Sequence, residues 1–171
     1  MKALTLLLCL LALAPASRVF AQPQLATIGW VEDVWFDMLG GSLPAKIDTG
    51  ADNSSVHAED WTITGEGRER TVSFTLVKRD GSQVSLTSPL LKITRIKSRT
   101  DGRIERPVIM LDVCIAGQAI QARFNLSKRA KFKYPVLVGR SLLAGHFLVD
   151  SGRTDTSKPG CSGATRPRNG R

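Results

Sequence analysis

Two stretches of sequence decide the fold, and the first of them reads Ala45-Lys46-Ile47-Asp48-Thr49-Gly50-Ala51-Asp52. In this stretch an aspartate follows a largely apolar segment, and Thr, Gly and a small residue come after the aspartate. The second stretch, about ninety residues later, reads Val136-Leu137-Val138-Gly139-Arg140-Ser141-Leu142-Leu143 and offers an apolar run, a glycine and a helix start. The triplet Asp-Thr-Gly alone is weak evidence, because such a triplet often only turns the chain. Any prediction of the fold from these motifs therefore depends on both stretches together.

The N-terminus predicts a secretory signal peptide over residues 1–21. It has one early charge at Lys2, an apolar run, and Val19-Phe20-Ala21 before an expected cleavage ahead of Gln22. The apolar run of about 12 residues is shorter than the roughly 20 that a membrane-spanning helix needs, so an uncleaved anchor is the less favoured alternative. We expect a periplasmic or secreted protein with no stable membrane insertion after cleavage.

The remaining 150 residues suffice for one domain and are too few for two. Without the two basic residues of the leader, the mature chain has 22 basic and 15 acidic residues, a net charge of +7. This charge favours anionic partners such as acidic peptides, membrane surfaces or envelope polymers, although simple solubility explains it equally well. Nucleic acid is not expected, because the basic residues lack interleaved aromatic side chains and the chain has one Tyr.

Two cysteines remain after cleavage, Cys114 and Cys161. An oxidising compartment permits a disulfide between them. However, Cys114 lies in a strand-like run and Cys161 in a Gly/Ser/Pro-rich segment. We therefore favour a buried, unbridged Cys114 that packs as a small apolar residue, with the disulfide as the alternative.

Short strands separated by glycine-containing turns predict an all-β barrel or sandwich. The Asp80-Gly81 pair between alternating segments indicates a hairpin. One short helix is expected at Ser141 to Ala144. Residues 151–171 predict a disordered basic tail, which leaves 22–150 as the folded domain. The expected strands are Ile28 to Phe36, Leu43 to Asp48, Thr71 to Val77, Val84 to Thr87, Leu90 to Ser98, Pro107 to Ile115 and Ala119 to Leu126.

The two stretches resemble the signature motifs of retropepsin-like aspartic peptidases. A wider set of segments is similar to the bacterial retropepsin-like family long labelled ATP-dependent zinc proteases, and it covers nearly all of Ile28 to Asp150. The resemblance implies an acid protease barrel with one short C-terminal helix. The chain departs from the family at Asp52-Asn53, where a basic residue and Thr are usual. The further matching segments are Ser54 to Ala58, Ile96 to Ser98, Arg106 to Ile109, Tyr134 to Arg140 and Phe147 to Asp150.

The resemblance also implies the chemistry. Two carboxylates that share one proton supply a base and an acid for the attack of water on an amide. Because the chain has a single Asp-Thr-Gly, the second Asp48 is expected from a two-fold-related copy in a homodimer. Thr49 is expected to tie the two active-site loops together through its hydroxyl. Gly50, followed by Ala51, lets the backbone pass close to the substrate.

In retropepsin-like folds, the second motif runs beneath the catalytic loop and starts a short helix. Val138 and Gly139 occupy that motif here, and the glycine is needed where two backbones lie close together. In the retroviral proteases, the arginine after the glycine pairs with the aspartate that closes the first motif. We therefore predict a structural ion pair between Arg140 and Asp52 within one subunit.

The zinc and ATP of the family label do not fit these residues, so no metal and no cofactor is expected. Zinc needs three or four ligands, and the chain has only His57 and His146, with no His-Glu-x-x-His motif. No Gly-x-x-x-x-Gly-Lys phosphate loop is present for ATP. We expect His57 to satisfy a nearby backbone group and His146 to lie in a surface turn.

Some members of the resembled family are thought to trim glutamate tails, and a basic peptidase suits an acidic peptide. Since export argues against an intracellular tail, an exported peptide or envelope protein is the expected substrate, held beside a hairpin flap such as Thr71 to Thr87. The alternative is a catalytically inactive, basic periplasmic binding module for anionic peptides or polymers. Oligomeric state separates the two, because a strict monomer has only one catalytic carboxylate.

Overall fold

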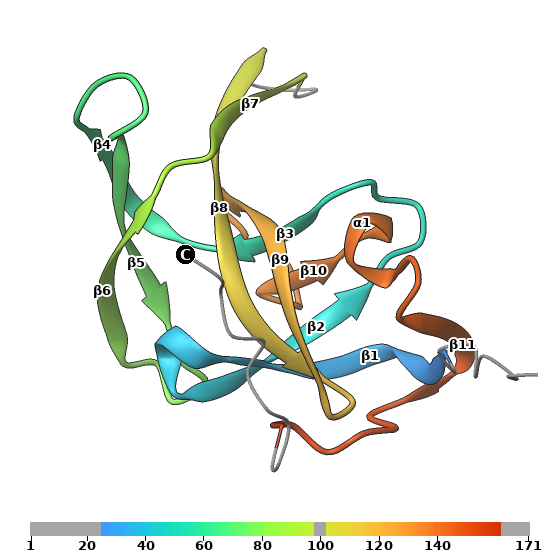
Figure 1. Ribbon diagram of the computed structural model, residues 1–171. Coiled ribbons are helices and arrows are strands. Elements are labelled where there is room, and N and C mark those ends of the chain that lie inside the picture. The colour runs from blue at the N-terminus through green and yellow to red at the C-terminus, as the bar shows by residue number, and fades with distance from the viewer. Residues whose placement is uncertain (1–24, 98–101, 162–171) are drawn as a thin grey trace, which may run out of the picture.

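The fold is taken from a computed structural model, which describes residues 25–97 and 102–161 (Figure 1). The predicted signal peptide and residues 162–171 of the predicted tail lie outside the described residues. Within the described part, no helix is long and apolar enough to cross a membrane.

Over the described residues the chain is all-β, as predicted, with one short α-helix and one 3-10 turn (Figure 1). Six of the seven predicted strands agree with the structure to within two residues at each end, the strand from Pro107 begins four residues earlier, and the helix begins one residue earlier than expected. The elements are β1 Ala26–Phe36, η1 Asp37–Leu39, β2 Gly41–Ile47, β3 Ser54–His57, β4 Glu59–Thr64, β5 Thr71–Val77, β6 Gln83–Pro89, β7 Lys92–Lys97, β8 Arg103–Ile115, β9 Gln118–Ser127, β10 Val136–Val138, α1 Arg140–Leu143 and β11 Phe147–Thr154.

Six strands close into a barrel. They follow the order β1, β2, β10, β3, β9 and β8, and the ring closes because β8 pairs back with β1 at Trp35 and Phe36. Closure removes exposed sheet edges that would otherwise pair with other chains. Strands β11 and β7 extend the sheet, and β4, β5 and β6 form a second, three-stranded sheet. This arrangement confirms the predicted retropepsin-like barrel.

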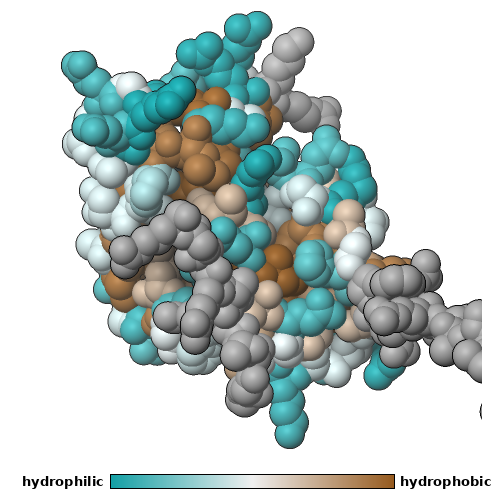
Figure 2. All heavy atoms as spheres, in the orientation of Figure 1, coloured by the Kyte–Doolittle hydropathy of each residue, from teal (hydrophilic) through white to brown (hydrophobic). Residues whose placement is uncertain are grey.

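The core fills the barrel and the space under the second sheet. Phe36 of β1 and Phe124 of β9 are fully buried, with ring centroids 5.7 Å apart in an edge-to-face contact. Phe74 of β5 joins the same cluster, so the three-stranded sheet packs on the barrel. Burial of each such side chain contributes about 1.5–3 kcal/mol. Figure 2 shows further apolar atoms, in brown, at the surface between the three-stranded sheet and β7.

The Thr71 to Thr87 hairpin does not cover the Asp48 loop, so its expected role as a flap is wrong. Its turn lies against the start of β2, where residues Lys78 to Asp80 line a hollow with Leu39 and Gly41. Arg79 forms an ion pair with Asp33 of β1 there. Asp48 follows the opposite end of β2.

The chain remains ordered beyond residue 150, so the predicted disordered tail is wrong over residues 151–161. β11 pairs in parallel with β1 and runs to Thr154. The next segment crosses the buried carboxylate of Glu32, which accepts hydrogen bonds from the backbone and hydroxyl groups of Thr156 and Ser157. Polar residues are ordered here because a buried acceptor satisfies their donors.

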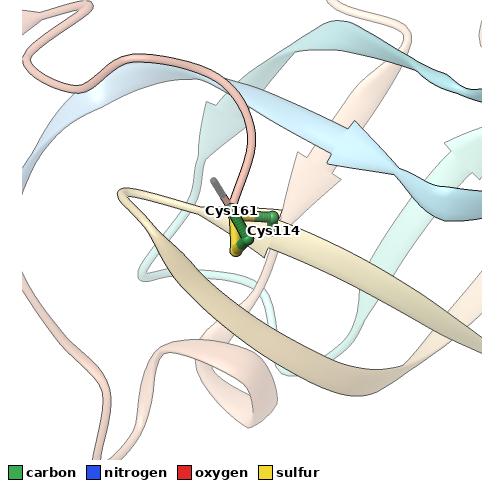
Figure 3. Close-up of a disulfide and its surroundings, with 2 residues drawn as sticks. All are labelled: Cys114 and Cys161. Carbon is green, nitrogen blue, oxygen red and sulfur yellow. A yellow bond between two sulfur atoms is a disulfide. The ribbon is translucent and has the colours of Figure 1, made fainter. Parts of the chain in front are cut away.

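A disulfide joins Cys114 of β8 to Cys161, which corrects the preference for an unbridged Cys114 (Figure 3). Cys114 is buried opposite Trp35 of β1. Figure 3 shows the C-terminal segment passing over this end of the β8 strand. Because the segment after β11 returns across the barrel, it brings Cys161 within bonding reach, and this return is not visible in the sequence.

Candidate active site

Asp48 lies at the end of β2, in the turn that leads to β3. β2 pairs in parallel with β10, with Ile47 opposite Val138. The backbone N–H of Asp48 donates to the carbonyl of Val138 at 2.8 Å. The structure therefore brings the two signature stretches together, although they are ninety residues apart in sequence.

The carboxylate of Asp48 is fixed by its own loop. Its Oδ1 accepts a 3.0 Å hydrogen bond from the backbone N–H of Gly50, and its Oδ2 lies 3.6 Å from Nζ of Lys46. The backbone N–H of Ala51 donates to the Asp48 carbonyl and closes the turn. The side chain keeps 25% of its surface exposed, so the carboxylate is held in place yet accessible to water and substrate.

Gly139 lies where the second stretch passes under the loop. A Cβ at this position would meet the backbone of Asn53 at 2.7 Å and the carbonyl of Ala51 at 3.0 Å. The N–H of Gly139 donates to Oγ of Ser54 at 3.1 Å, and the N–H of Arg140 donates to the Ala51 carbonyl at 2.9 Å. Only glycine fits such a close approach.

Arg140 and Asp52 form an ion pair within the chain. Nη1 of Arg140 also donates to the carbonyl of Thr49 at 2.8 Å, so the guanidinium spans the loop from Thr49 to Asp52. Both charged side chains are largely exposed, at 51% and 75%. The pair braces the outer edge of the Asp48 loop. Thr49 itself is exposed.

Arg129, in the loop after β9, is a site residue that the sequence did not reveal. It is 9% exposed, and its Nη1 donates to Oγ of Ser55, while its Nε donates to the carbonyl of Tyr134, both at 3.3 Å. Burial lowers the pKa of Arg129, and the charge of Arg106 lowers it further, whereas the Asp48 carboxylate acts in the opposite direction. Of these three influences burial is the largest and the charge of Asp48 the smallest.

The two histidines are not arranged as zinc ligands. Nδ1 of His57 accepts a 3.0 Å hydrogen bond from the N–H of Arg129, and its Nε2 lies 3.3 Å from Glu59. His146 lies in the turn before β11. Within residues 25–97 and 102–161, no three His, Cys, Asp or Glu side chains gather in a way that could hold a metal ion. These residues do not fit zinc.

Comparison with curated proteins finds similarity to probable alpha-L-glutamate ligases. The chain is 30% identical over 128 residues to the protein from Shewanella halifaxensis and 30% identical over 127 residues to that from Shewanella pealeana. Each match covers 72% of this chain but only 28% of the relative. The chain thus matches about a quarter of the length of these relatives.

A solved structure shares the fold. It is the crystal structure of a protein of unknown function from Legionella pneumophila, with a TM-score of 0.67 and 29% sequence identity. The match covers 78% of this chain and 98% of that one.

The family comparison covers most of the described chain and includes both signature stretches. A family model described as RimB-like, retropepsin-like aspartic endopeptidase RimB, matches residues 27–159. The matched range contains the Asp48 loop, the Gly139 crossing and the buried Arg129. The chain therefore belongs to the RimB-like family of retropepsin-like aspartic endopeptidases.

Proposed function

We propose that this protein is an exported, homodimeric aspartic endopeptidase in which Asp48 is the catalytic residue. The observation that carries the proposal is the Asp48 loop itself. Its carboxylate accepts from the Gly50 N–H, stays partly open to solvent, and rests on the Gly139 crossing. Such a fixed and accessible carboxylate is suited to general acid–base work.

The proposed reaction uses two Asp48 carboxylates that share one proton. The ionised one takes a proton from water, whose oxygen forms a bond to the carbonyl carbon, while the protonated one donates its proton to the carbonyl oxygen. The tetrahedral gem-diol then collapses: one hydroxyl returns its proton to the ionised Asp48, the C–N bond breaks, and the amine nitrogen takes the proton that the other Asp48 had received from water. Two like charges at close range favour a singly protonated pair, because full ionisation of both is unfavourable.

The homodimer is proposed because one chain supplies one Asp-Thr-Gly. A two-fold axis beside the loop would place the two copies of Asp48 together and make the contact self-complementary. The exposure of Thr49, and of the Arg140 and Asp52 side chains, on a single chain agrees with a partner at this surface.

An acidic peptide or protein is the proposed substrate. The chain carries a net charge of +9, and its relatives are named as probable alpha-L-glutamate ligases. A positive protein raises the local concentration of anionic substrates near its surface. If the leader is cleaved as proposed, the substrate is an exported peptide or envelope protein.

The test uses the chain from Gln22 onward, a mixed peptide library that includes acidic peptides, and a range from mildly acidic to neutral pH. Wild type is compared with Asp48→Asn and with Asp112→Asn, which removes an exposed carboxylate on β8. Dimer content is followed by analytical ultracentrifugation. The proposal expects cleavage by wild type and by Asp112→Asn, and loss of cleavage in an Asp48→Asn protein that still dimerises.

The second candidate is a catalytically inactive binding module for anionic peptides or polymers. The observation that favours it is the single Asp-Thr-Gly in a strongly basic chain. A protein that stays monomeric at working concentration, cleaves nothing and still binds acidic peptides would support this candidate instead.

A further inference from the structure

Arg129 is a buried cation that forms no ion pair among the described residues, although the charge of Asp48 acts on it. Its hydrogen bonds to Ser55 and Tyr134 go to neutral oxygens and use two of its five N–H donors. The guanidinium carbon lies 4.7 Å from the centre of the Phe132 ring. The ion pairs of the described residues do not include Arg129. A buried charge is costly unless an opposite charge compensates it.

A short chain of contacts connects Arg129 to the catalytic loop. Ser55, which accepts from Arg129, is the neighbour of Ser54, which accepts from the Gly139 N–H. Val138, just before Gly139, accepts from the Asp48 N–H. The β3 residue that Arg129 contacts is therefore next in sequence to the one that contacts the Gly139 crossing.

A second arginine approaches the same place. The β8–β9 ladder ends at the pair of Val108 and Asn125, two residues from Arg106, and the charge of Arg106 acts on Arg129. Burial lowers the pKa of Arg106. One of these cations is buried and the other partly buried, so they repel one another, and an anion bound to both relieves the repulsion.

We propose that Arg129 and Arg106 bind a carboxylate of the substrate beside the bond that is cleaved. The inference rests on the proposed peptidase function and assigns the residues that determine its specificity. A guanidinium held at Nε and Nη1 is pre-oriented, so it offers its remaining donors to a carboxylate in a fixed fork. The carboxylate comes either from an acidic side chain or from the C-terminus of the substrate peptide.

The test starts from the peptide that wild type cleaves best. Four versions are compared: the parent, a version with each Glu or Asp next to the cleaved bond changed to Gln or Asn, a C-terminally amidated version, and one with both changes. We expect kcat/KM to fall about ten- to hundredfold when the recognised carboxylate is removed. A fall with the side-chain change identifies an acidic side chain, and a fall with the amide identifies the C-terminus.

The same peptides are then measured with Arg129→Gln, Arg129→Lys and Arg106→Gln. The proposal expects the ratio of kcat/KM between acidic and neutral peptides to collapse toward one in Arg129→Gln and to shrink in Arg106→Gln. Arg129→Lys, which keeps the charge but loses the fork, should retain an intermediate ratio. Lys128→Gln removes an exposed charge next in sequence and should leave the ratio unchanged. Because Arg129→Gln perturbs a buried site, the folding of this variant is checked by circular dichroism. If Arg129→Gln does not fold, the ratio measured with Arg106→Gln decides whether the proposal holds.

Binding separates failure of this inference from failure of the peptidase function. Fluorescence anisotropy of labelled acidic peptides and their amide counterparts is measured on Asp48→Asn protein. Tighter binding of acidic peptides that is lost in the Arg129 and Arg106 variants supports the carboxylate site even if wild type cleaves nothing. Equal binding and equal cleavage of acidic and neutral peptides overturns it, as does a preference that both arginine variants retain.

Discussion

Replacing Glu32 by Gln should destabilise the protein strongly, although Glu32 has no part in the proposed chemistry. Its carboxylate is fully buried. Oε1 accepts from the N–H of Gly29 at 2.7 Å and from the N–H and hydroxyl of Thr156, and Oε2 accepts from the hydroxyl of Ser157 at 2.8 Å and its N–H at 3.2 Å. One side chain thus anchors the segment after β11 to β1.

The magnitude follows from the acceptors that Gln lacks. Glutamine keeps one oxygen but turns an NH₂ group toward Ser157, whose partly buried N–H then loses its acceptor at a cost of about 1–3 kcal/mol. The bonds to the remaining oxygen lose their charge assistance, which adds about 1 kcal/mol. We expect Glu32→Gln to lower the free energy of unfolding by about 2–4 kcal/mol, a large share of the stability of a small domain.

The pH dependence gives a second signature. Burial acts to raise the pKa of Glu32, but its hydrogen bonds outweigh this and hold the pKa below the ordinary value of 4.5. A lowered pKa contributes stability that is present above the unfolded value and is lost as the pH falls through the folded value. The difference between wild type and Glu32→Gln should therefore be full near neutral pH and shrink below about pH 4.5.

Urea unfolding with the disulfide intact, at neutral pH and at several values below 4.5, measures both effects. The control is Glu66→Gln, which removes an exposed carboxylate in the turn after β4 and should change stability by less than about 0.5 kcal/mol. A loss in Glu32→Gln no larger than that of the control, or a loss that persists undiminished in acid, would refute the reasoning.

Three further changes test other parts of the fold by the same urea unfolding. Cys114→Ser removes a disulfide that closes a loop with a sequence separation of 47 and should cost about 4 kcal/mol, whereas an unchanged midpoint would mean the bridge does not constrain the chain. Gly139→Ala should cost about 3 kcal/mol because its Cβ meets backbone at 2.7 Å, while Gly41→Ala, whose Cβ meets nothing within 4 Å, should be nearly neutral; similar losses in both would contradict this account. Asp52→Asn should lower the free energy of unfolding by less than about 1 kcal/mol, since its pair with Arg140 is exposed. A larger loss would show that the pair stabilises more of the fold than the Asp48 loop.

Strands in which apolar and polar residues alternate were predictable from the sequence. β5 alternates buried and exposed residues along its length, and Asp80-Gly81 marks its turn to β6. β4 was missed because a register shift between Glu59 and Thr62, with Asp60 at a φ of 52°, interrupts the alternation. The end of β11 was missed because polar residues there are ordered by pairing to β1, and pairing leaves no mark in composition.

The amino-acid sequence was enough to predict the all-β class, the Asp48 and Gly139 motifs and the Asp52–Arg140 contact, because each depends on local spacing or on a short motif. Which distant residues meet became clear only in the folded chain. Pairing between strands that are distant in sequence, and the path of the chain after β11, bring Arg129 near the Asp48 loop, Glu32 to Thr156, and Cys114 to Cys161. Such contacts join residues far apart in the chain, and their formation depends on strand order and register across the closed sheet, which no local pattern encodes.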